Sequence, residues 1–245
     1  MELVEQTDIV VFSAHAADFC SRSGGMIALA TRAGQSVHVV DLTFGERGES
    51  EDYWARAGSA SIEDARRVRA GEAVEAAAIL GAGIEFLDFH DYPLTITGER
   101  IEQLAAILRA RRPATVLTHW EHDPYNVDHE ETARAVRRAA TIAAIPGFDP
   151  ASAVLRYPAL FAFEPTIPRN DETGFQPTHY VIIDDVFEVK MRALACLQSQ
   201  RKLVPMYTQW GEYRGAQARQ WSGRQIRHAE AFRRNTAVVT DGPLG

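Results

Sequence analysis

The chain has 245 residues and a mass of 27.2 kDa, which allows one large domain or two small ones with a well-buried core. Hydrophobic residues make up 46% and charged residues 24% of the sequence, which excludes a disordered or collagen-like chain. The net charge of -7 provides no overall positive field for phosphate groups, so we expect no nucleic-acid partner.

Two further classes are disfavoured by the sequence. The apolar runs are shorter than the roughly 20 residues that span a bilayer, so we expect no membrane partner and a cytoplasmic location. The two cysteines, Cys20 and Cys196, lack C-x-x-C spacing, which disfavours a disulfide framework or a thiolate zinc site. We therefore expect any bound metal to be held by histidines and carboxylates.

Short apolar, β-branched runs alternate along the chain with segments rich in good helix formers. The expected strands are residues 8–12, 37–43, 84–87, 114–118, 159–163 and 180–183. The expected helices are residues 26–32, 61–80, 100–111, 130–143 and 186–200. This alternation predicts an α/β fold, a Rossmann-like and mostly parallel sheet with helices on both faces.

We expect a single domain over residues 1–245, because no linker or repeat divides the chain. From about residue 205 the sequence is rich in Trp, Arg and Gln with weak periodicity. This part is expected to be irregular and to close over the sheet.

Polar residues follow several of the predicted strands. His15 and Asp18 come after the first strand, Glu46 and Glu49 after the second, and the segment 119–129 after the fourth. Ligands bind open parallel sheets beyond the carboxyl ends of the strands, so these side chains are expected to meet there.

Two imidazoles and one carboxylate, from His15, Asp18 and His129, would form a common ligand set for catalytic zinc. The nearby His119 and His122 are alternative ligands. The spacing fits equally well a hydrogen-bonded histidine at a strand end and an aspartate that caps the next helix.

Three stretches carry a resemblance to a known family: VFSAHAADFCSRSGG from residue 11, LTFGERGES from residue 42, and HDPYNVDH from residue 122. The sequence resembles the PIG-L family, also called LmbE-like proteins, which are mostly zinc-dependent deacetylases of amino-sugar conjugates. The resemblance implies that zinc binds His15, Asp18 and His129.

The sequence departs from the family pattern at the groups that transfer protons. Ala17 occupies the position of the general base, and Asn126 that of an assisting histidine. Leu197 stands where the pattern has a histidine, seven residues after Lys190. The implied metal ligands remain while proton-transfer groups for amide hydrolysis are missing, which indicates a changed reaction.

A hydratase branch of the family fits better. The sequence is similar to the 4-oxalomesaconate hydratases through FGERGES, DYPL at residues 91–94, FAFEP at 161–165 and RG-x-QA at 214–218. The branch has a histidine after FEP, where this chain has Thr166. The resemblance implies a zinc-dependent hydro-lyase that adds water to the C=C bond of an unsaturated keto-polycarboxylate.

On this hypothesis each site residue has a role. The base that activates water is Glu49 or Glu46, with Glu49 the first choice, unless both are surface residues of a Gly-rich loop. Asp128 orients a ligand imidazole. The expected substrate-binding residues are Arg47, Arg214, Asn126 and Tyr125. The arginines could also be solvated surface residues, and Asn126 an ordinary turn former.

Two other functions stay open. One is a family deacetylase of an acylated amine, with a glutamate in place of the lost aspartate. The other is a metal- or ligand-binding protein without catalysis. The expected partner is a small carboxylate substrate, and analogy with the family suggests a homo-oligomer.

Overall fold

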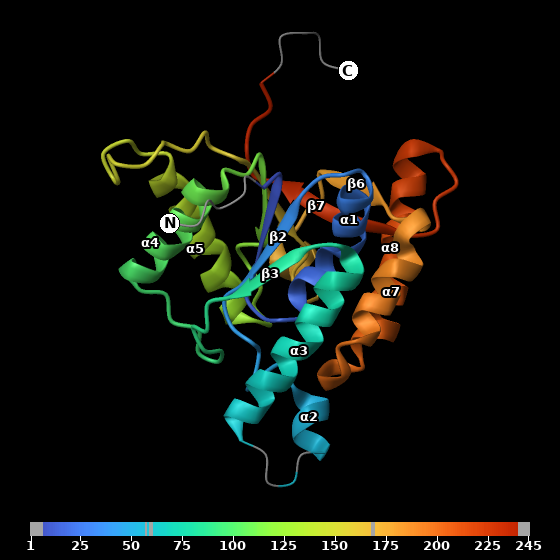
Figure 1. The fold of residues 1–245 in the computed structure, drawn as a ribbon. Coiled ribbons are helices and arrows are strands. Elements are labelled where there is room, and N and C mark those ends of the chain that lie inside the picture. Colours follow the sequence, from blue (N-terminus) through green and yellow to red (C-terminus); the bar gives the residue numbers. More distant parts are fainter. Residues whose placement is uncertain (1–6, 57, 59–60, 168–169, 240–245) are drawn as a thin grey trace.

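A seven-stranded sheet forms the centre of the computed structural model, which describes residues 7–56, 58, 61–167 and 170–239 (Figure 1). Its strand order is β3-β2-β1-β4-β5-β7-β6. The strands are β1 (Ile9–Ser13), β2 (Val37–Asp41), β3 (Gly83–Phe86), β4 (Thr115–His119), β5 (Ala159–Phe163), β6 (His179–Ile182) and β7 (Ala229–Arg234). The apolar strand β1 lies between β2 and β4, inside the sheet, as its uninterrupted β-branched sequence predicts.

Most neighbouring strands in this sheet are parallel. β1 pairs in parallel with β2 and β4, β2 with β3, and β4 with β5. β7 pairs antiparallel with both β5 and β6, so among the described strands it alone runs in the opposite direction. The predicted α/β class with a mostly parallel sheet is confirmed. The carboxyl ends of β1, β2 and β4 therefore share one edge.

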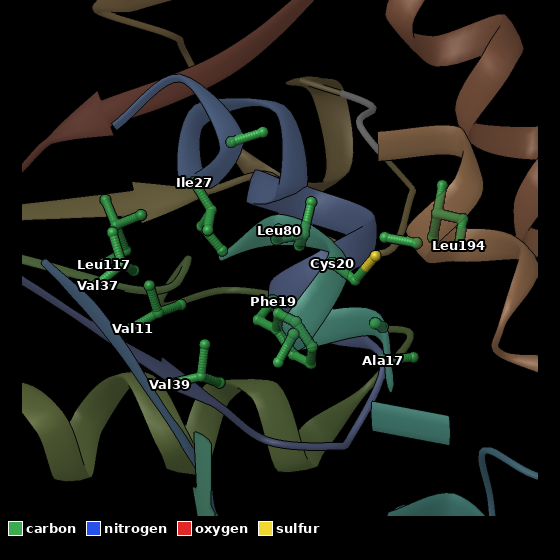
Figure 2. Close-up of a cluster of buried hydrophobic side chains, with 14 of the residues drawn as sticks. Val11, Ala17, Phe19, Cys20, Ile27, Val37, Val39, Leu80, Leu117 and Leu194 are labelled. Atoms are coloured by element: carbon green, nitrogen blue, oxygen red, sulfur yellow. The ribbon is translucent and has the colours of Figure 1, made fainter. Parts of the chain in front are cut away.

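One face of the sheet is covered by α1 (Asp18–Arg32), α3 (Ile62–Leu80) and α7 (Phe187–Ala195). Figure 2 shows Val11 and Val39 of the sheet near Phe19 of α1 and Leu80 of α3, within one buried cluster. Phe19 is fully buried and directly follows Asp18. Burial of its ring therefore anchors the first turn of α1, and Asp18 with it, at the carboxyl edge of the sheet.

The opposite face is covered by α4 (Gly98–Arg111) and α5 (Val127–Ala143), which lie across the sheet from α3 and α7 in Figure 1. Val10 and Phe12 of β1 belong to this second core with Leu104 of α4 and Val136 of α5, and all four are fully buried. Because α5 follows β4 directly, its first turn also lies at the carboxyl edge.

Two helices that carry candidate site residues begin earlier than predicted. α1 begins at Asp18 and not at residue 26, so the Ser-Gly-Gly run that resembles a loop lies inside the helix. Gly25 is required for close packing, since a Cβ atom there would lie 2.6 Å from a side-chain carbon of Ile183. α5 begins at Val127 instead of residue 130. The first turns of two helices therefore hold residues that we expected in loops.

The carboxyl-terminal region is regular where we expected irregular structure. It contains α8 (Leu203–Ser222) followed by β7. The buried positions of α8 follow helical spacing but include Gly211, Arg214 and Gly215, which hides the apolar periodicity in the sequence. The predicted helix 186–200 is also divided, because α7 ends at Ala195 and a separate 3-10 turn, η2 (Gln198–Gln200), follows.

The remaining helical elements are short. They are α2 (Glu51–Arg56), α6 (Asn170–Thr173) and the 3-10 turn η1 (Asp184–Val186). Within the described residues, no helix combines the length and the apolar character needed to cross a bilayer.

The close approach of α8 to the chain before β7 gives a test of the packing. A Cβ atom on Gly215 would lie 2.1 Å from the carbonyl oxygen of Arg227, and backbone cannot yield as a side chain does. We expect Gly215→Ala to lower the free energy of unfolding by about 1–3 kcal/mol. At the exposed Gly71 of α3 an added Cβ meets nothing within 4 Å, so Gly71→Ala should raise it by about 0.5–1 kcal/mol. Denaturant unfolding measures both, and equal stability of Gly215→Ala and wild type would contradict this packing.

Candidate metal centre and active site

Side chains that follow β1, β2 and β4 converge at the carboxyl edge of the sheet. His15 follows β1, Glu49 lies in the loop after β2, and His129 lies in the first turn of α5. These three side chains each offer a ligand atom, and the atoms lie within 4.8 Å of one another. Asp18, His119 and His129 form a second, overlapping set. The structure therefore brings together residues that are separated by more than 100 positions in the sequence.

Two of the predicted metal ligands, the histidines, lie around one carboxylate oxygen of the third, Asp18. Oδ2 of Asp18 lies 3.3 Å from Nδ1 of His15 and 3.4 Å from Nε2 of His129. All three residues are buried. Asp18 is the first residue of α1 and does not cap it, and its Oδ2 accepts a hydrogen bond from the backbone N–H of His15. The alternative role of Asp18 as a helix cap is therefore wrong.

The tautomer of His15 is determined by Asp128. Nε2 of His15 lies 3.2 Å from Oδ2 of Asp128, which also accepts the backbone N–H of Tyr92. Burial raises the pKa of Asp128, but these hydrogen bonds outweigh it and hold that pKa below its ordinary value. An ionised carboxylate only accepts, so Nε2 carries the proton and donates. Nδ1, which has no hydrogen-bond partner among the described residues, faces Asp18.

His129 is held in the same way by a different carboxylate. Nδ1 of His129 lies 2.8 Å from Oδ2 of Asp123. Burial raises the pKa of Asp123, but the hydrogen bond from His129 and nearby positive charges bring it below the ordinary value. Nδ1 therefore donates to Asp123. Nε2, facing Asp18, is buried and has no hydrogen-bond partner in the described chain.

These contacts form a cradle suited to a cation. Two buried imidazole nitrogens without partners face one carboxylate oxygen, and buried polar groups in proteins are normally paired. Each imidazole donates its other N–H to a carboxylate, the arrangement that orients histidine ligands and makes them more basic. His15, Asp18 and His129 therefore fit a divalent ion bound by nitrogen and oxygen ligands.

The two alternative histidines have other partners. Nε2 of His119 accepts the backbone N–H of Ala14 at 2.9 Å, so the atom nearest Asp18 is already engaged. Burial and the neighbouring His129 hold the pKa of His119 well below its ordinary value. His122 is largely exposed and pairs with Glu130 at 3.0 Å. His119 thus lies beside the cradle as a neutral ring stacked on His129, and His122 lies outside it.

Glu49 and Glu46, the two candidate bases, have different surroundings. Oε1 of Glu49 accepts hydrogen bonds from the phenol of Tyr92 at 3.2 Å and from Nδ2 of Asn126 at 3.0 Å. Oε2 accepts from Nε2 of Gln200 at 2.5 Å. All three donors are uncharged, so they orient the carboxylate without neutralising it. Glu49 is half-buried beside His15 and His129.

Glu46, predicted as an alternative base, pairs with residues outside this cluster. Its carboxylate is fully buried, with Oε1 3.4 Å from Nε of Arg66 and 3.5 Å from Nδ1 of His90. Glu46 is therefore an ion-pair partner of α3 and of the loop after β3. Its neighbour Asp91 joins the same two loops, because its carboxylate accepts the backbone N–H groups of Arg47 and Gly48.

The two predicted substrate arginines also differ. Arg47 is exposed, and its guanidinium donates from Nη1 to the carbonyl of Asp91 at 2.9 Å. Arg214 is buried and donates from Nε and Nη2 to Oε2 of Glu164 at 2.9 and 2.5 Å. Arg47 keeps donors for a carboxylate ligand, whereas Arg214 is committed to a buried ion pair. A substrate-binding role for Arg214 is therefore a poor fit to the structure.

The other predicted residues lie near the entrance or behind the ligands. Asn126 is buried, and its Oδ1 has no hydrogen-bond partner among the described residues. Tyr125 is exposed and donates to Glu172. Asp128, predicted among the catalytic groups as the carboxylate that orients a ligand, is a positioning residue for His15, while Asp123 orients His129.

Tyr92 is a site residue that the sequence analysis missed. Its ring stacks on His15 with centroids 5.6 Å apart and planes 5° apart, and its hydroxyl reaches Glu49. Burial and the charge of Glu49 raise its pKa, so the phenol keeps its proton. A Cβ atom on Gly48 would lie 2.2 Å from this ring, so the glycine makes room for it. The DYPL motif was the available signal.

Thr166 has a clear structural role. Its backbone N–H and hydroxyl both donate to Oδ2 of Asp123, at 2.7 and 2.8 Å. Arg22 links this segment to the cradle, because Nε donates to Oδ1 of Asp18 at 3.3 Å and Nη2 to the hydroxyl of Thr166 at 3.3 Å. Thr166 and Arg22 thereby hold the carboxylates that contact His129.

The sequence of this chain is similar to those of known proteins. The family model described as PIG-L: GlcNAc-PI de-N-acetylase matches residues 10–140. Over 242 residues the chain is 38% identical to a 4-oxalmesaconate hydratase of Pseudomonas putida, covering 96% of this chain and 92% of that protein. It is also 29% identical to a diacetylchitobiose deacetylase of Thermococcus kodakarensis, over 78% of this chain and 69% of that one.

The fold of this chain is similar to the folds of solved structures. The crystal structure of the 4-carboxy-2-hydroxymuconate hydratase of Pseudomonas putida superposes with a TM-score of 0.92 at 36% identity, covering 98% of this chain and 100% of that one. A conserved Thermus thermophilus protein superposes with a TM-score of 0.79 at 26% identity, over 96% and 97% of the two chains.

The protonation of His15 gives a testable pH dependence. Burial lowers its pKa, but the hydrogen bond to Asp128 and the charges of Asp18 and Glu49 outweigh this and raise the pKa to about 10 in the metal-free chain. Because proton and metal compete for the same ring, apparent zinc affinity should rise about tenfold per pH unit from about pH 7 to 9. Titration with a competing chelator at each pH measures this slope. In Asp128→Asn the affinity should level off at a lower pH, and a pH-independent wild type would contradict the assignment.

Proposed function

Because the chain belongs to the PIG-L family, we propose that it is a zinc-dependent hydratase within that family. The reaction is addition of water to the C=C bond of an unsaturated keto-polycarboxylate such as 4-oxalomesaconate or its enol form, 4-carboxy-2-hydroxymuconate. This chemistry belongs to the breakdown of aromatic acids. The similar Pseudomonas putida proteins bear the names of hydratases of this type.

The observation that carries the proposal is the position of Glu49. An oriented carboxylate lies beside a cradle that fits a metal ion, on an edge where ligands bind. Hydration needs a base that takes a proton from water and a positive centre that stabilises charge on a neighbouring carbonyl. Glu49 would act as the base, and a metal ion held by the cradle would supply the positive centre beside it.

The positions that serve amide hydrolysis in the family have other roles here. Ala17 and Leu197 are both part of the buried apolar cluster on the α1 face of the sheet. Asn126 uses its amide N–H to hold Glu49. None of these three side chains supplies a proton to a departing amine. Hydration releases no amine, so their character is compatible with it.

His15, Asp18 and His129 are the residues that would hold zinc, through Nδ1, Oδ2 and Nε2. A bound zinc ion supplies Lewis-acid stabilisation of negative charge on substrate oxygens. Asp128 and Asp123 keep the two imidazoles in the tautomers that this requires.

The proton balance of hydration can be closed by Glu49. Its carboxylate takes one proton from water while the hydroxyl oxygen forms a bond to one alkene carbon. The π electrons move toward the adjacent carbonyl, and the proton held by Glu49 is then returned to the other carbon. Water is thereby added in full, and the carboxylate is restored without a further reactant.

The surroundings suit an anionic substrate with a hydroxyl group. Arg47, exposed at the entrance, offers guanidinium donors to a distal carboxylate. The buried Oδ1 of Asn126 can accept from a substrate hydroxyl, because its Nδ2 is engaged by Glu49. Tyr125 lies farther out and is the weaker candidate.

The proposal also covers the location, assembly and partners of the protein. We infer a cytoplasmic homo-oligomer that acts on a small carboxylate, without a nucleic-acid or membrane partner. The net charge of -7 supports the absence of nucleic acid. A deacetylase of an acylated amine is the second candidate, because a deacetylase is among the similar proteins. Release of acetate from such substrates would favour it.

The two glutamates of the β2 loop provide the test. We expect Glu49→Gln to lower kcat for hydration by about 10²- to 10⁴-fold with zinc content unchanged, because the amide cannot take a proton. Glu46→Gln removes one of the three ion-pair partners of Arg66, which keeps Glu63 and Asp88, and should lower thermal stability while kcat stays within about threefold. Initial rates from substrate absorbance, with metal analysis of each protein, measure both.

The opposite pattern would overturn the assignment. Full activity in Glu49→Gln, or a larger loss in Glu46→Gln at equal zinc content, would mean that another group moves the proton.

A further inference from the structure

A chain of buried polar side chains connects Glu49 to helix α3. Oε2 of Glu49 accepts from Nε2 of Gln200 at 2.5 Å, and Oε1 of Gln200 accepts from Nη2 of Arg69 at 3.0 Å. Nη1 of Arg69 lies 3.3 Å from Oε2 of Glu72. Gln200 is 2% exposed and Arg69 is fully buried. Residues 49 and 200 are 151 positions apart, so only the fold brings them together.

The amide of Gln200 is fixed in one orientation. A guanidinium only donates, so the oxygen of the amide must face Arg69 and its NH2 group must face Glu49. Arg69 is itself held by the carbonyl of Phe44 at 3.1 Å. The amide therefore presents a donor to the carboxylate and cannot rotate without leaving buried Arg69 short of a partner.

The turn that carries Gln200 is anchored to the same helix. Oε1 of Glu72 accepts both the backbone N–H and the hydroxyl of Ser199, each at 2.9 Å. Glu72 thus joins the η2 turn to α3 through Oε1, and its Oε2 pairs with Arg69. Burying a guanidinium and its partners is costly, and a loop could be joined to a helix by apolar contacts at lower cost.

We propose that Gln200, held by Arg69 and Glu72 of α3, is the positioning residue that sets the orientation of the Glu49 carboxylate for proton transfer. The inference rests on the proposed function only in the identity of the reaction. Gln200 acts through Glu49 and touches no reacting atom. Tyr92 and Asn126 hold Oε1, and the buried Gln200 holds Oε2.

The expected effect is on kcat. Gln200→Met keeps the length of the side chain and removes both polar contacts, so the carboxylate of Glu49 loses its fixed angle. We expect kcat to fall by about 10- to 100-fold, as small misplacements of catalytic groups do, with KM within about twofold. The matched control is Gln198→Met in the same turn, where the exposed side chain donates to the carbonyl of Ala195 and kcat should stay unchanged.

A cycle with Glu49→Gln separates positioning from a general loss of structure. In the Glu49→Gln background, Gln200→Met should lower kcat by less than about a further twofold. The side chain at position 49 no longer takes a proton there, so its orientation matters little. Zinc content and unfolding midpoints are measured on every variant. Unchanged kcat in Gln200→Met, or an equal further loss in the Glu49→Gln background, would overturn the proposal.

If the wild type hydrates no unsaturated keto acid, a crystal structure of Gln200→Met tests the positioning role of Gln200 instead. That result would defeat the proposed function alone. The positioning inference then stands if the carboxylate of Glu49 is displaced in Gln200→Met and not in Gln198→Met, and it fails if the carboxylate is unmoved in both.

Discussion

Two carboxylate–imidazole contacts determine the chemistry of this site. Asp128 accepts a hydrogen bond from Nε2 of His15, and Asp123 accepts one from Nδ1 of His129. Each contact turns the opposite nitrogen toward Asp18. Such a buried cluster is unfavourable unless a proton or a cation lies within it, so metal binding stabilises an arrangement that the fold already imposes.

The fold supplies this arrangement through four consecutive boundaries between strands and the segments that follow. β1 and β4 are neighbours in the sheet, so α1 and α5 begin side by side and bring Asp18 and His129 together. The loop after β2 adds Glu49, and the loop after β3 adds Tyr92. The final turn before α8 then supplies Gln200 from behind. The candidate metal ligands follow strands at the centre of the sheet, and Glu49 is held where several loops meet.

The sequence predicts the centre of this site well and its edges poorly. The strands and the residues that follow β1 are visible because apolar runs and short spacings are local signals. The spacing of Glu46 and Glu49 in the sequence does not show which of them lies beside the histidines. The ion pair of Glu46 with Arg66 of α3 forms only in the folded chain. The pairing of Arg214 with Glu164 and the contact of Gln200 with Glu49 span 50 and 151 positions and leave no local pattern. Helix α8 is hidden because its buried face contains glycines and an arginine.

Metal-dependent hydration should remove the conjugated absorbance of 4-oxalomesaconate. Zinc-loaded wild type should remove the absorbance rapidly, whereas the metal-stripped protein and His129→Ala should not, because the cradle then holds no ion. The same samples are assayed for acetate release from acylated amino sugars. Unchanged absorbance with zinc-loaded wild type, together with acetate release, would contradict the account and identify a deacetylase.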